Sequence, residues 1–288
     1  MHREREQQAP AQAKKSFFPR PWPLLRLCAS TARWLGQLFV GRIRGERRCV
    51  LCHAVFFSFP RDGAEAGGRG AAGSPFCPGC LSSMPRREKG HCPLCGEPAA
   101  WPELPLAPCI RCVKAAPPWD SLHFHGLYGG QLRRVLRLLK FVNMPQFGQA
   151  LGWLLSRQPE LRLLQVDLVS AIPLHEKRLA RRGYNQSLEI ARALARSLSL
   201  PLRPDVLRRS RYTPPQVGFN FEARQQNMRQ AFTATAAVRG QRILLVDDIL
   251  TTGATMRAAV GALHEAGALA VHAAVVSRVA RHGRGVPV

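Results

Sequence analysis

The sequence has 288 residues, which is enough for one or two domains with a hydrophobic core. Its formal net charge of +24 at pH 7 is extreme for a metabolic enzyme. It indicates an anionic partner, nucleic acid or an acidic membrane surface, unless it only reflects an arginine-rich genome. No stretch approaches the roughly 20 apolar residues of a membrane span, and a long polar lead with Glu4 and Glu6 disfavours a signal peptide. We expect a cytoplasmic protein without a transmembrane segment.

Residues 1–44 are basic and contain four prolines, at positions 10, 19, 21 and 23. This composition predicts a poorly ordered N-terminal arm. Leu25, Leu35, Leu38 and Phe39 also fit a short amphipathic helix, which would dock on the body of the protein or on an anionic surface.

Eight of the nine cysteines form four Cys-x-x-Cys pairs within residues 45–116, and only Cys28 lies outside them. Two residues between thiolates let a tight turn direct both sulfurs at one tetrahedral ion, so two pairs complete a Cys₄ zinc site. We predict two structural zinc ions in a small double zinc ribbon. Chain order assigns Cys49, Cys52, Cys77 and Cys80 to one ion, and Cys92, Cys95, Cys109 and Cys112 to the other. The sequence leaves a crossed pairing open.

Other uses of cysteine fit this pattern less well. A disulfide scaffold needs an oxidising compartment, to which the sequence shows no route. A thioredoxin-like redox site has a single Cys-x-x-Cys at a helix start. Iron–sulfur proteins space their thiolates in closer runs. Structural zinc is therefore favoured.

Pro117 and Pro118 mark a domain boundary, after which the Cys-x-x-Cys pairs stop. Buried strands are predicted at 121–129, 168–172 and 243–249, and amphipathic helices at 131–141, 187–197 and 256–266. Their alternation indicates an α/β fold, a parallel sheet flanked by helices, over residues 117–288. In the first helix the charged residues lie mostly opposite the apolar face and are expected to be solvated, with contact to nucleic acid as the alternative: Arg133, Arg134, Arg137 and Lys140.

A basic segment follows the strand at 168–172 and contains Lys177, Arg178, Arg181 and Arg182. A loop at the carboxyl end of a parallel strand is where an α/β sheet binds an anion. Alternatively, the segment only packs the next helix, for which Asn185 and Gln186 are suitable N-cap residues.

The segment 242–255 reads Arg-Ile-Leu-Leu-Val-Asp-Asp-Ile-Leu-Thr-Thr-Gly-Ala-Thr and predicts a buried strand, a tight polar turn and a helix start. Such a turn offers backbone N–H groups and hydroxyls to a phosphate, here from Thr251, Thr252, Gly253, Ala254 and Thr255. Asp247 and Asp248 would repel a phosphate but accept hydrogen bonds from hydroxyls. A ribose 5-phosphate carries both groups. The alternative is a structural strand with a chance acidic pair.

These motifs carry a family resemblance. Residues 243–255 resemble the phosphoribosyl pyrophosphate (PRPP) signature of type I phosphoribosyltransferases. Arg182-Gly-Tyr-Asn-Gln186 resembles the Arg-Gly-Phe-Asn-Gln element of the ComF family of competence-associated proteins, which includes GntX, with Tyr184 in place of Phe. Residues 208–232 are similar to that family's mobile segment. The motifs occur in the family's order, and the resemblance extends from Cys49 to about Val275.

The resemblance implies a type I phosphoribosyltransferase-like fold preceded by a zinc ribbon. By it, Asp247 and Asp248 hold the ribose hydroxyls, residues 251–255 hold the 5-phosphate, and the basic segment assists pyrophosphate departure together with Mg²⁺. It implies a PRPP-binding protein associated with DNA uptake and natural transformation, with single-stranded DNA and competence-machinery proteins as partners. Two alternatives remain: a nucleic-acid-binding module with a regulatory or vestigial PRPP site, and a nucleobase-salvage enzyme. Turnover of PRPP stays open, because no nucleobase-recognition element is evident.

Overall fold

The computed structural model describes residues 46–57, 73–84, 87, 90–99, 107–210 and 231–281. The chain divides between Arg44 and Gly45, and every described residue belongs to the second unit. The arm predicted over residues 1–44 and most of the family-like segment at 208–232 lie outside the described residues. The domain boundary predicted after residue 116 stays a prediction.

The helices of the described ranges are α2 (Pro78–Ser82), α3 (Ile110–Lys114), α4 (Gly130–Phe141), α5 (Gln146–Ser156), α6 (Pro159–Leu163), α7 (Glu176–Arg182), α8 (Gln186–Leu198) and α10 (Ala254–Glu265). The strands are β1 (Glu46–Arg48), β2 (Val55–Phe57), β3 (Ser121–Leu127), β4 (Leu168–Ala171), β5 (Leu207–Arg209), β6 (Phe232–Ala234), β7 (Arg242–Leu250) and β8 (Ala270–Arg278). None of these helices has the length and hydrophobicity that a membrane span requires.

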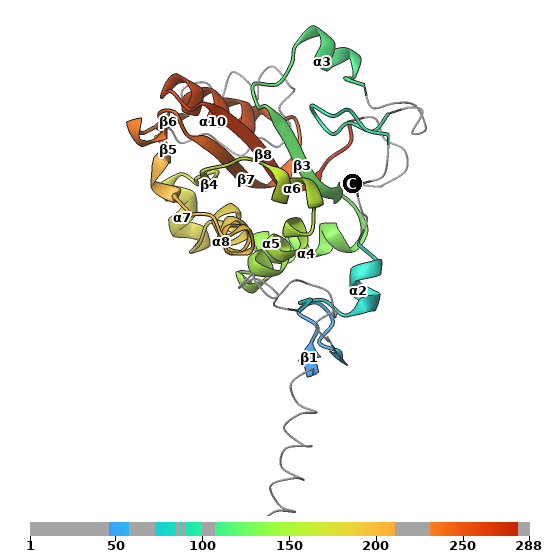
Figure 1. The fold of residues 1–288 in the computed structure, drawn as a ribbon. Helices are drawn as coiled ribbons and strands as arrows, with labels where there is room; N and C mark the ends of the chain where they lie inside the picture. Colours follow the sequence, from blue (N-terminus) through green and yellow to red (C-terminus); the bar gives the residue numbers. More distant parts are fainter. Residues whose placement is uncertain are drawn as a thin grey trace, which may run out of the picture. The chain divides into compact units, whose positions relative to one another are not determined.

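A four-stranded parallel sheet with the order β3-β8-β7-β4 forms the centre of the fold (Figure 1). The hairpins β1–β2 and β5–β6 are antiparallel and separate from it. The α/β fold with a parallel sheet, predicted from alternating strands and helices, is therefore confirmed.

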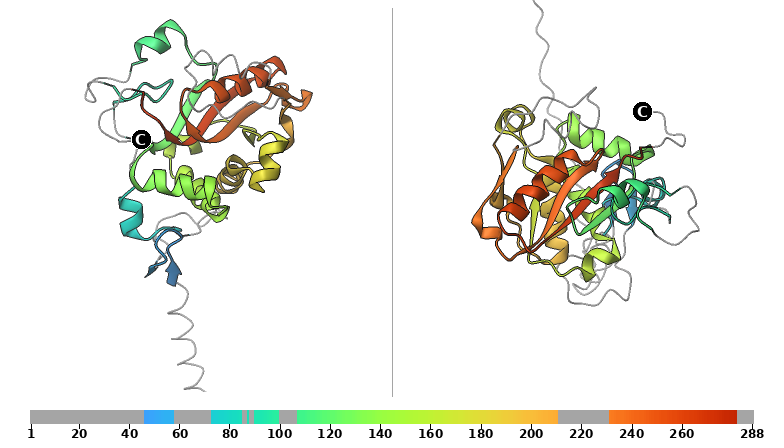
Figure 2. Two further views of the ribbon diagram at one scale, coloured as in Figure 1. Left: turned by 180° about the vertical axis from the view of Figure 1, so that it is seen from behind. Right: turned by 90° about the horizontal axis from the view of Figure 1, so that it is seen from above.

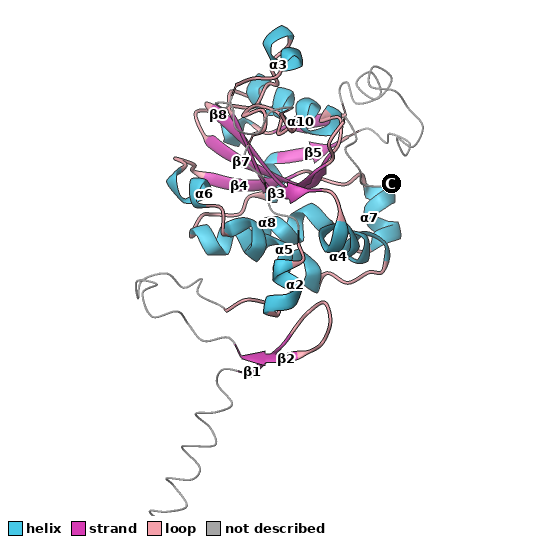
Figure 3. Ribbon diagram, turned by 90° about the vertical axis from the view of Figure 1, so that its right-hand side faces the viewer, coloured by secondary structure: helices cyan, strands magenta, loops and turns pink. Residues whose placement is uncertain are grey.

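Helices cover both faces of the sheet, and the alternation of side chains along β7 shows why. Leu244 and Val246 belong to the buried cluster that includes α4, α5 and α8. Ile243 and Leu245 belong to the cluster that includes α10. Successive strand residues point to opposite faces, so an uninterrupted apolar run needs cover on each side. Figures 1 and 3 show α10 on one side of the sheet and α4, α5 and α8 on the other, and Figure 2 shows the same layers from behind.

The six strands and helices predicted for residues 117–288 all occur, each within two residues of its predicted ends. The basic segment predicted as a loop is instead the helix α7, and that part of the prediction is wrong. His175 caps α7 by accepting the amide of Lys177 at Nδ1, and Gly183 ends it at φ 80°. These two residues supply the start and stop signals that the loop interpretation overlooked.

The cysteine-rich segment contributes to the main hydrophobic core. Leu51, Phe76 and Met84 belong to the same buried cluster as Leu132 of α4 and Leu151 of α5. Apolar burial therefore supports this segment in addition to any metal that its thiols bind.

The close approach of α5 and α8 predicts opposite effects for two glycine substitutions. A Cβ at Gly152 would lie 2.6 Å from Cβ of Ala193, whereas a Cβ at Gly261 in α10 would meet nothing within 4 Å. Gly152→Ala should destabilise the protein by about 1–3 kcal/mol through overpacking. Gly261→Ala should stabilise it by about 0.5–1 kcal/mol, because alanine loses less backbone entropy in a helix. Urea denaturation measures both, and equal effects of the two variants would contradict the packing described.

Candidate functional site

The turn after β7 has the predicted form. Gly253 is the N-cap of α10 at φ 80°, a conformation that glycine adopts without strain. A Cβ there would also lie 3.3 Å from Cη2 of Trp119. The amide of Ala254 donates to Oγ1 of Thr252 at 3.4 Å. Residues 251–255 thus form a tight turn that leads into a helix N-terminus, the local geometry that binds anions.

The two carboxylates of β7 are partly or fully buried and hold different partners. Asp248 is 5% exposed, and its Oδ2 lies 3.4 Å from Nζ of Lys140 on α4. Asp247 Oδ1 accepts hydrogen bonds from the Ser187 hydroxyl (2.8 Å) and from the Asp248 amide (2.9 Å). Burial, together with the charge of Asp248, raises the pKa of Asp247 to about 7 against the effect of these donors. Near pH 7 the pair is therefore close to taking up one proton, which would remove one of its two negative charges.

Arginines from two elements act electrostatically on the carboxylates. Burial lowers the pKa of Arg182, at the end of α7, and the attraction of Asp248 opposes that shift. Burial also lowers the pKa of Arg209 in β5 to about 10, with repulsion from Arg178 adding to it and attraction by Asp247 opposing it. Arg182 also donates to Oε1 of Gln186 at 2.7 Å, which fixes its direction. Cations and carboxylates thus share one end of the sheet.

The predicted basic residues occupy different positions on α7. Arg178 and Arg182 are partly buried and interact with the groups around the carboxylates, whereas Lys177 and Arg181 are exposed. Asn185 is the N-cap of α8, as predicted, because its Oδ1 accepts the amide of Ser187 at 3.1 Å.

Three residues of the site were not predicted: Lys140, Ser187 and Arg209. Lys140 was expected on a solvated face, and its pairing with Asp248 shows that this expectation was wrong. Its position at the last turn of α4 gave no signal, because the contact depends on how α4 packs on the sheet. Ser187 could have been found, since it follows the recognised N-cap Asn185 at the start of α8.

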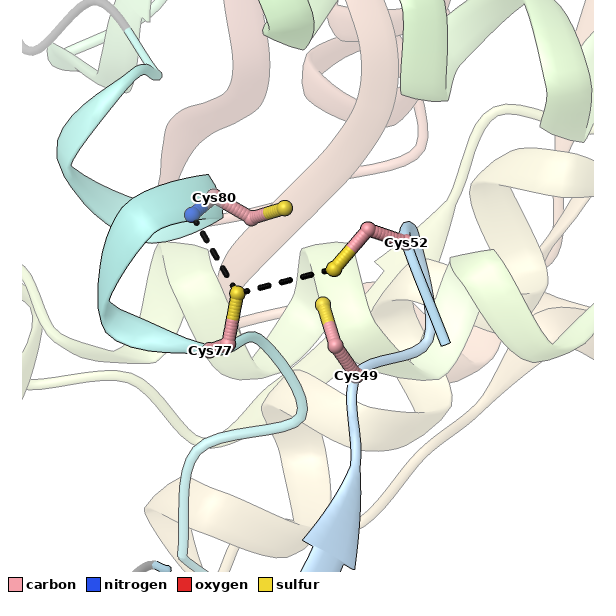
Figure 4. A group of neighbouring side chains, drawn as sticks. All are labelled: Cys49, Cys52, Cys77 and Cys80. Atoms are coloured by element: carbon pink, nitrogen blue, oxygen red, sulfur yellow. Dashed lines mark hydrogen bonds between the residues drawn. The ribbon is translucent and has the colours of Figure 1, made fainter. Parts of the chain in front are cut away.

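The cysteines form two clusters in chain order, with the sulfurs of each cluster within 4.8 Å of one another. Figure 4 shows the four sulfurs of the first cluster converging. The Sγ atoms of Cys52 and Cys77 are 3.6 Å apart. In the second cluster, the Sγ atoms of Cys95 and Cys109 are 3.7 Å apart. A tetrahedron with metal–sulfur bonds of about 2.3 Å has edges of about 3.8 Å. Both clusters could hold a metal ion, and the grouping agrees with the sequential pairing rather than the crossed one.

Backbone amides donate to sulfur in both clusters. The Cys80 amide donates to Sγ of Cys77 at 3.4 Å, and the Cys109 amide donates to Sγ of Cys92 at 3.3 Å. Such donors favour the thiolate, which is the form that binds a metal.

Comparison with known proteins shows the family of this chain. The family described as "Phosphoribosyl transferase domain" matches residues 185–287. DNA utilization protein YhgH of Escherichia coli K12 is 33% identical over 197 residues, which cover 66% of this chain and 85% of YhgH. The chain belongs to the ComF family. Another member, competence protein F of Haemophilus influenzae, is 29% identical over 190 residues, 62% of this chain and 80% of that protein.

Among solved structures, the glutamine PRPP amidotransferase of Bacillus subtilis is 25% identical to this ComF-family chain, with a TM-score of 0.32. The match covers 46% of this chain and 26% of the amidotransferase. The parallel sheet, its flanking helices and the family match define the fold.

The raised pKa of Asp247 predicts a stability that depends on pH. Between about pH 4 and pH 7 the folded state keeps a proton that the unfolded state has lost, so wild-type stability falls as pH rises. Asp247→Asn preserves the acceptor Oδ1 and lacks this titration. It should exceed wild type by about 1–4 kcal/mol at pH 8, and the difference should shrink toward pH 4.

Denaturant unfolding across pH 4–8 provides the measurement, with Asp205→Asn as the control. The hydrogen bond from Arg203 holds the pKa of Asp205 down at about 2, so this exposed carboxylate is ionised throughout the interval. Its replacement should not stabilise the protein above pH 4. A pH-independent effect of Asp247→Asn would contradict the electrostatic account.

Proposed function

We propose that this protein binds PRPP through the turn after β7 and acts in the handling of DNA during uptake. One observation carries the proposal: buried carboxylates and a helix N-terminal turn follow one another along a single strand end. Carboxylates accept hydrogen bonds from hydroxyls, and the turn suits a phosphate. A ribose 5-phosphate carries both kinds of group, hydroxyls on the ring and a phosphate on the exocyclic C5.

In this proposal, Asp247 and Asp248 accept hydrogen bonds from the ribose 2- and 3-hydroxyls. Residues 251–255 hold the 5-phosphate with backbone N–H groups and threonine hydroxyls. Lys140 forms an ion pair with Asp248 and so lowers the free-energy cost of burying this carboxylate. Ser187 directs Oδ1 of Asp247 and keeps the carboxylate plane fixed for the ligand.

The α7 cations would face the pyrophosphate of PRPP. Lys177, Arg178, Arg181 and Arg182 supply charge at the carboxyl end of β4, where parallel sheets bind ligands. If the protein turns PRPP over, breaking the ribose–pyrophosphate bond builds negative charge on the leaving group, which these residues stabilise. Mg²⁺ bound with the pyrophosphate would neutralise part of the same charge.

We further propose that zinc occupies both cysteine clusters. Four thiolates in a tetrahedral arrangement suit Zn²⁺, and metal-free thiols at these distances would repel one another once ionised. A cytoplasmic location fits this assignment, because thiols stay reduced there.

The association with DNA uptake rests on relatives and on charge. Two relatives are named DNA utilization protein and competence protein F. The net charge of +24 suits a polyanionic partner such as single-stranded DNA, held near the PRPP site or delivered by competence-machinery proteins.

Isothermal titration calorimetry with Mg²⁺-PRPP tests the ribose assignment. Hydrogen bonds to a charged partner are worth about 1.5–3 kcal/mol each, so Asp247→Asn with Asp248→Asn should weaken binding at least about tenfold. The control is Asp167→Asn, whose carboxylate accepts the Arg242 amide at the amino-terminal end of the strands, the opposite end from the turn. It should leave the affinity unchanged. An unchanged affinity in the double variant, or no binding to wild type, would refute the assignment.

A second candidate function is binding of nucleic acid at α4, and the exposed face of this helix favours it. Arg134 and Arg137 are exposed there, and α4 contains no acidic residue. Phe141 is 72% exposed, so a base could stack on its ring. A surface hollow on this face is lined by Gly130, Arg133, Arg134, Arg137, Leu138, Phe141 and Val142. In this reading the PRPP site is regulatory or vestigial.

Binding at α4 should be electrostatic and depend steeply on salt. Arg134→Gln with Arg137→Gln should weaken the binding of single-stranded DNA and reduce the slope of log affinity against log salt by about 1.4, roughly 0.7 for each lost phosphate contact. Arg162→Gln with Arg196→Gln removes the same charge from exposed positions on α6 and α8 and should have less effect. Equal losses in both variants would show that net charge, and not the α4 face, determines binding.

A further inference from the structure

Arg278, the last residue of β8, is buried to an unusual degree for an arginine. It is 1% exposed and is the bulkiest side chain among the fully buried ones that the structure describes. A buried guanidinium is costly unless its donors are satisfied. Burial lowers the pKa of Arg278, and the carboxylate of Glu97 opposes that shift. The hydrogen-bond partners of the Arg278 side chain therefore indicate its structural role.

One side of the guanidinium holds carbonyl groups of the turn after β7, the proposed phosphate site. Nη1 donates to the carbonyl oxygens of Thr251 (2.9 Å) and Leu250 (3.3 Å), and to that of Val279. Arg281, three residues on, donates from Nη2 to the carbonyl oxygen of Thr252 at 2.8 Å. Three successive carbonyls at the end of β7 are thus anchored by two arginines.

The other side of the guanidinium holds the second cysteine cluster. Nε donates to the carbonyl oxygen of Cys95 at 2.8 Å, and Nη2 pairs with Oε2 of Glu97 at 2.8 Å. The second carboxylate oxygen of Glu97 accepts the amide of Arg281 at 2.8 Å. Glu97 therefore fixes both arginines, and it lies two residues after a candidate metal ligand.

Trp119 makes a second connection between the same two regions. Its Nε1 donates to the carbonyl oxygen of Leu94 at 2.7 Å, between the ligands Cys92 and Cys95. Its ring lies against Gly253, and the guanidinium of Arg257 stacks over it at 5.4 Å. Leu94 and Gly253 are thus held by one rigid side chain.

The direction of the carbonyl groups in the turn determines the direction of its backbone N–H groups. In a trans peptide the C=O and the following N–H point in opposite directions, and the described residues contain no cis peptide. Carbonyls of residues 250, 251 and 252 that point at Arg278 and Arg281 therefore turn the N–H groups of 251, 252 and 253 the other way. Those N–H groups belong to the turn that we propose as the phosphate site, the cradle of residues 251–255.

We infer that Glu97 and Arg278 are positioning residues that couple metal occupancy of the second cysteine cluster to phosphate affinity at the turn. This inference rests on the proposed function for the turn as a phosphate site. A metal that orders Cys95 fixes the carbonyl of Cys95 and the side chain of Glu97, and through them Arg278 and the cradle. Within the described residues, the hydrogen bonds above join this arginine pair to the segment of the second cluster, at Cys95 and Glu97.

Coupling of this kind is reciprocal. If metal in the second cluster strengthens phosphate binding, then bound phosphate strengthens retention of that metal by the same factor. Ligand binding should therefore raise the affinity for one of the two zinc equivalents, the one held by Cys92, Cys95, Cys109 and Cys112, and we expect this gain as slower release. The first cluster, packed on the α4 and α5 side of the core, should release its zinc at an unchanged rate.

Glu97→Gln in the full-length protein tests the coupling without altering a metal ligand or a cradle residue. The matched control is Glu160→Gln, which breaks another arginine–glutamate pair, with Arg87 at 2.5 Å. Three quantities are compared: Mg²⁺-PRPP affinity by calorimetry, zinc release to a chromogenic chelator with and without PRPP, and amide hydrogen exchange of residues 250–254 without ligand. If Glu97→Gln fails to fold, Trp119→Phe is used in its place, because it removes the hydrogen bond from Trp119 to the carbonyl oxygen of Leu94.

Wild type should release one of two zinc equivalents at least about threefold more slowly with PRPP bound. Glu97→Gln should abolish this slowing, lower PRPP affinity by about three- to tenfold and speed exchange at 250–254. Glu160→Gln should behave as wild type. If wild type does not bind PRPP but Glu97→Gln still speeds both exchange and zinc release, the proposed function fails, while the connection between the second cysteine cluster and the turn stands. If PRPP binds and Glu97→Gln changes none of the three quantities, the coupling is refuted.

Discussion

Two adjacent carboxylates at the carboxyl end of a buried strand are the constraint on which the rest of the site depends. Burying Asp247 and Asp248 costs free energy, which nearby donors and cations must offset. Lys140 of α4, Ser187 of α8 and the arginines of α7 and β5 meet this need from four separate elements. The compensation is incomplete, because the pKa of Asp247 remains raised to about 7. A ligand with hydroxyl donors would complete it.

The parts of the fold that could be predicted from sequence are those with short-range causes. The uninterrupted apolar run of β7 demands cover on both faces, and the turn at 251–253 leads directly into α10. The Cys-x-x-Cys spacing defines each half of a metal site within four residues. Joining the halves needed only the assumption that neighbouring pairs meet, which the sulfur distances support.

The parts that could not be predicted depend on contacts between distant segments. Lys140 and Asp248 are 108 positions apart in the chain (248 − 140 = 108). From helical periodicity alone, Lys140 is predicted to face solvent. Arg278 looks like an ordinary charged residue at a strand end, yet it joins residues 95–97 to residues 250–251. The α7 segment was mistaken for a loop because Pro173 and Gly183 frame it closely, and a helix of this length leaves little periodicity to detect.

A crystal structure of the protein with Mg²⁺-PRPP is the most direct test of the central claim. We expect ribose hydroxyls within about 3 Å of the Asp247 and Asp248 carboxylates, and the 5-phosphate against the amides of residues 251–255. The carbonyls of Leu250 and Thr251 should still point at Arg278. PRPP bound at another surface, such as the arginines of α4, with the β7 carboxylates still paired only to Lys140 and Ser187, would contradict it.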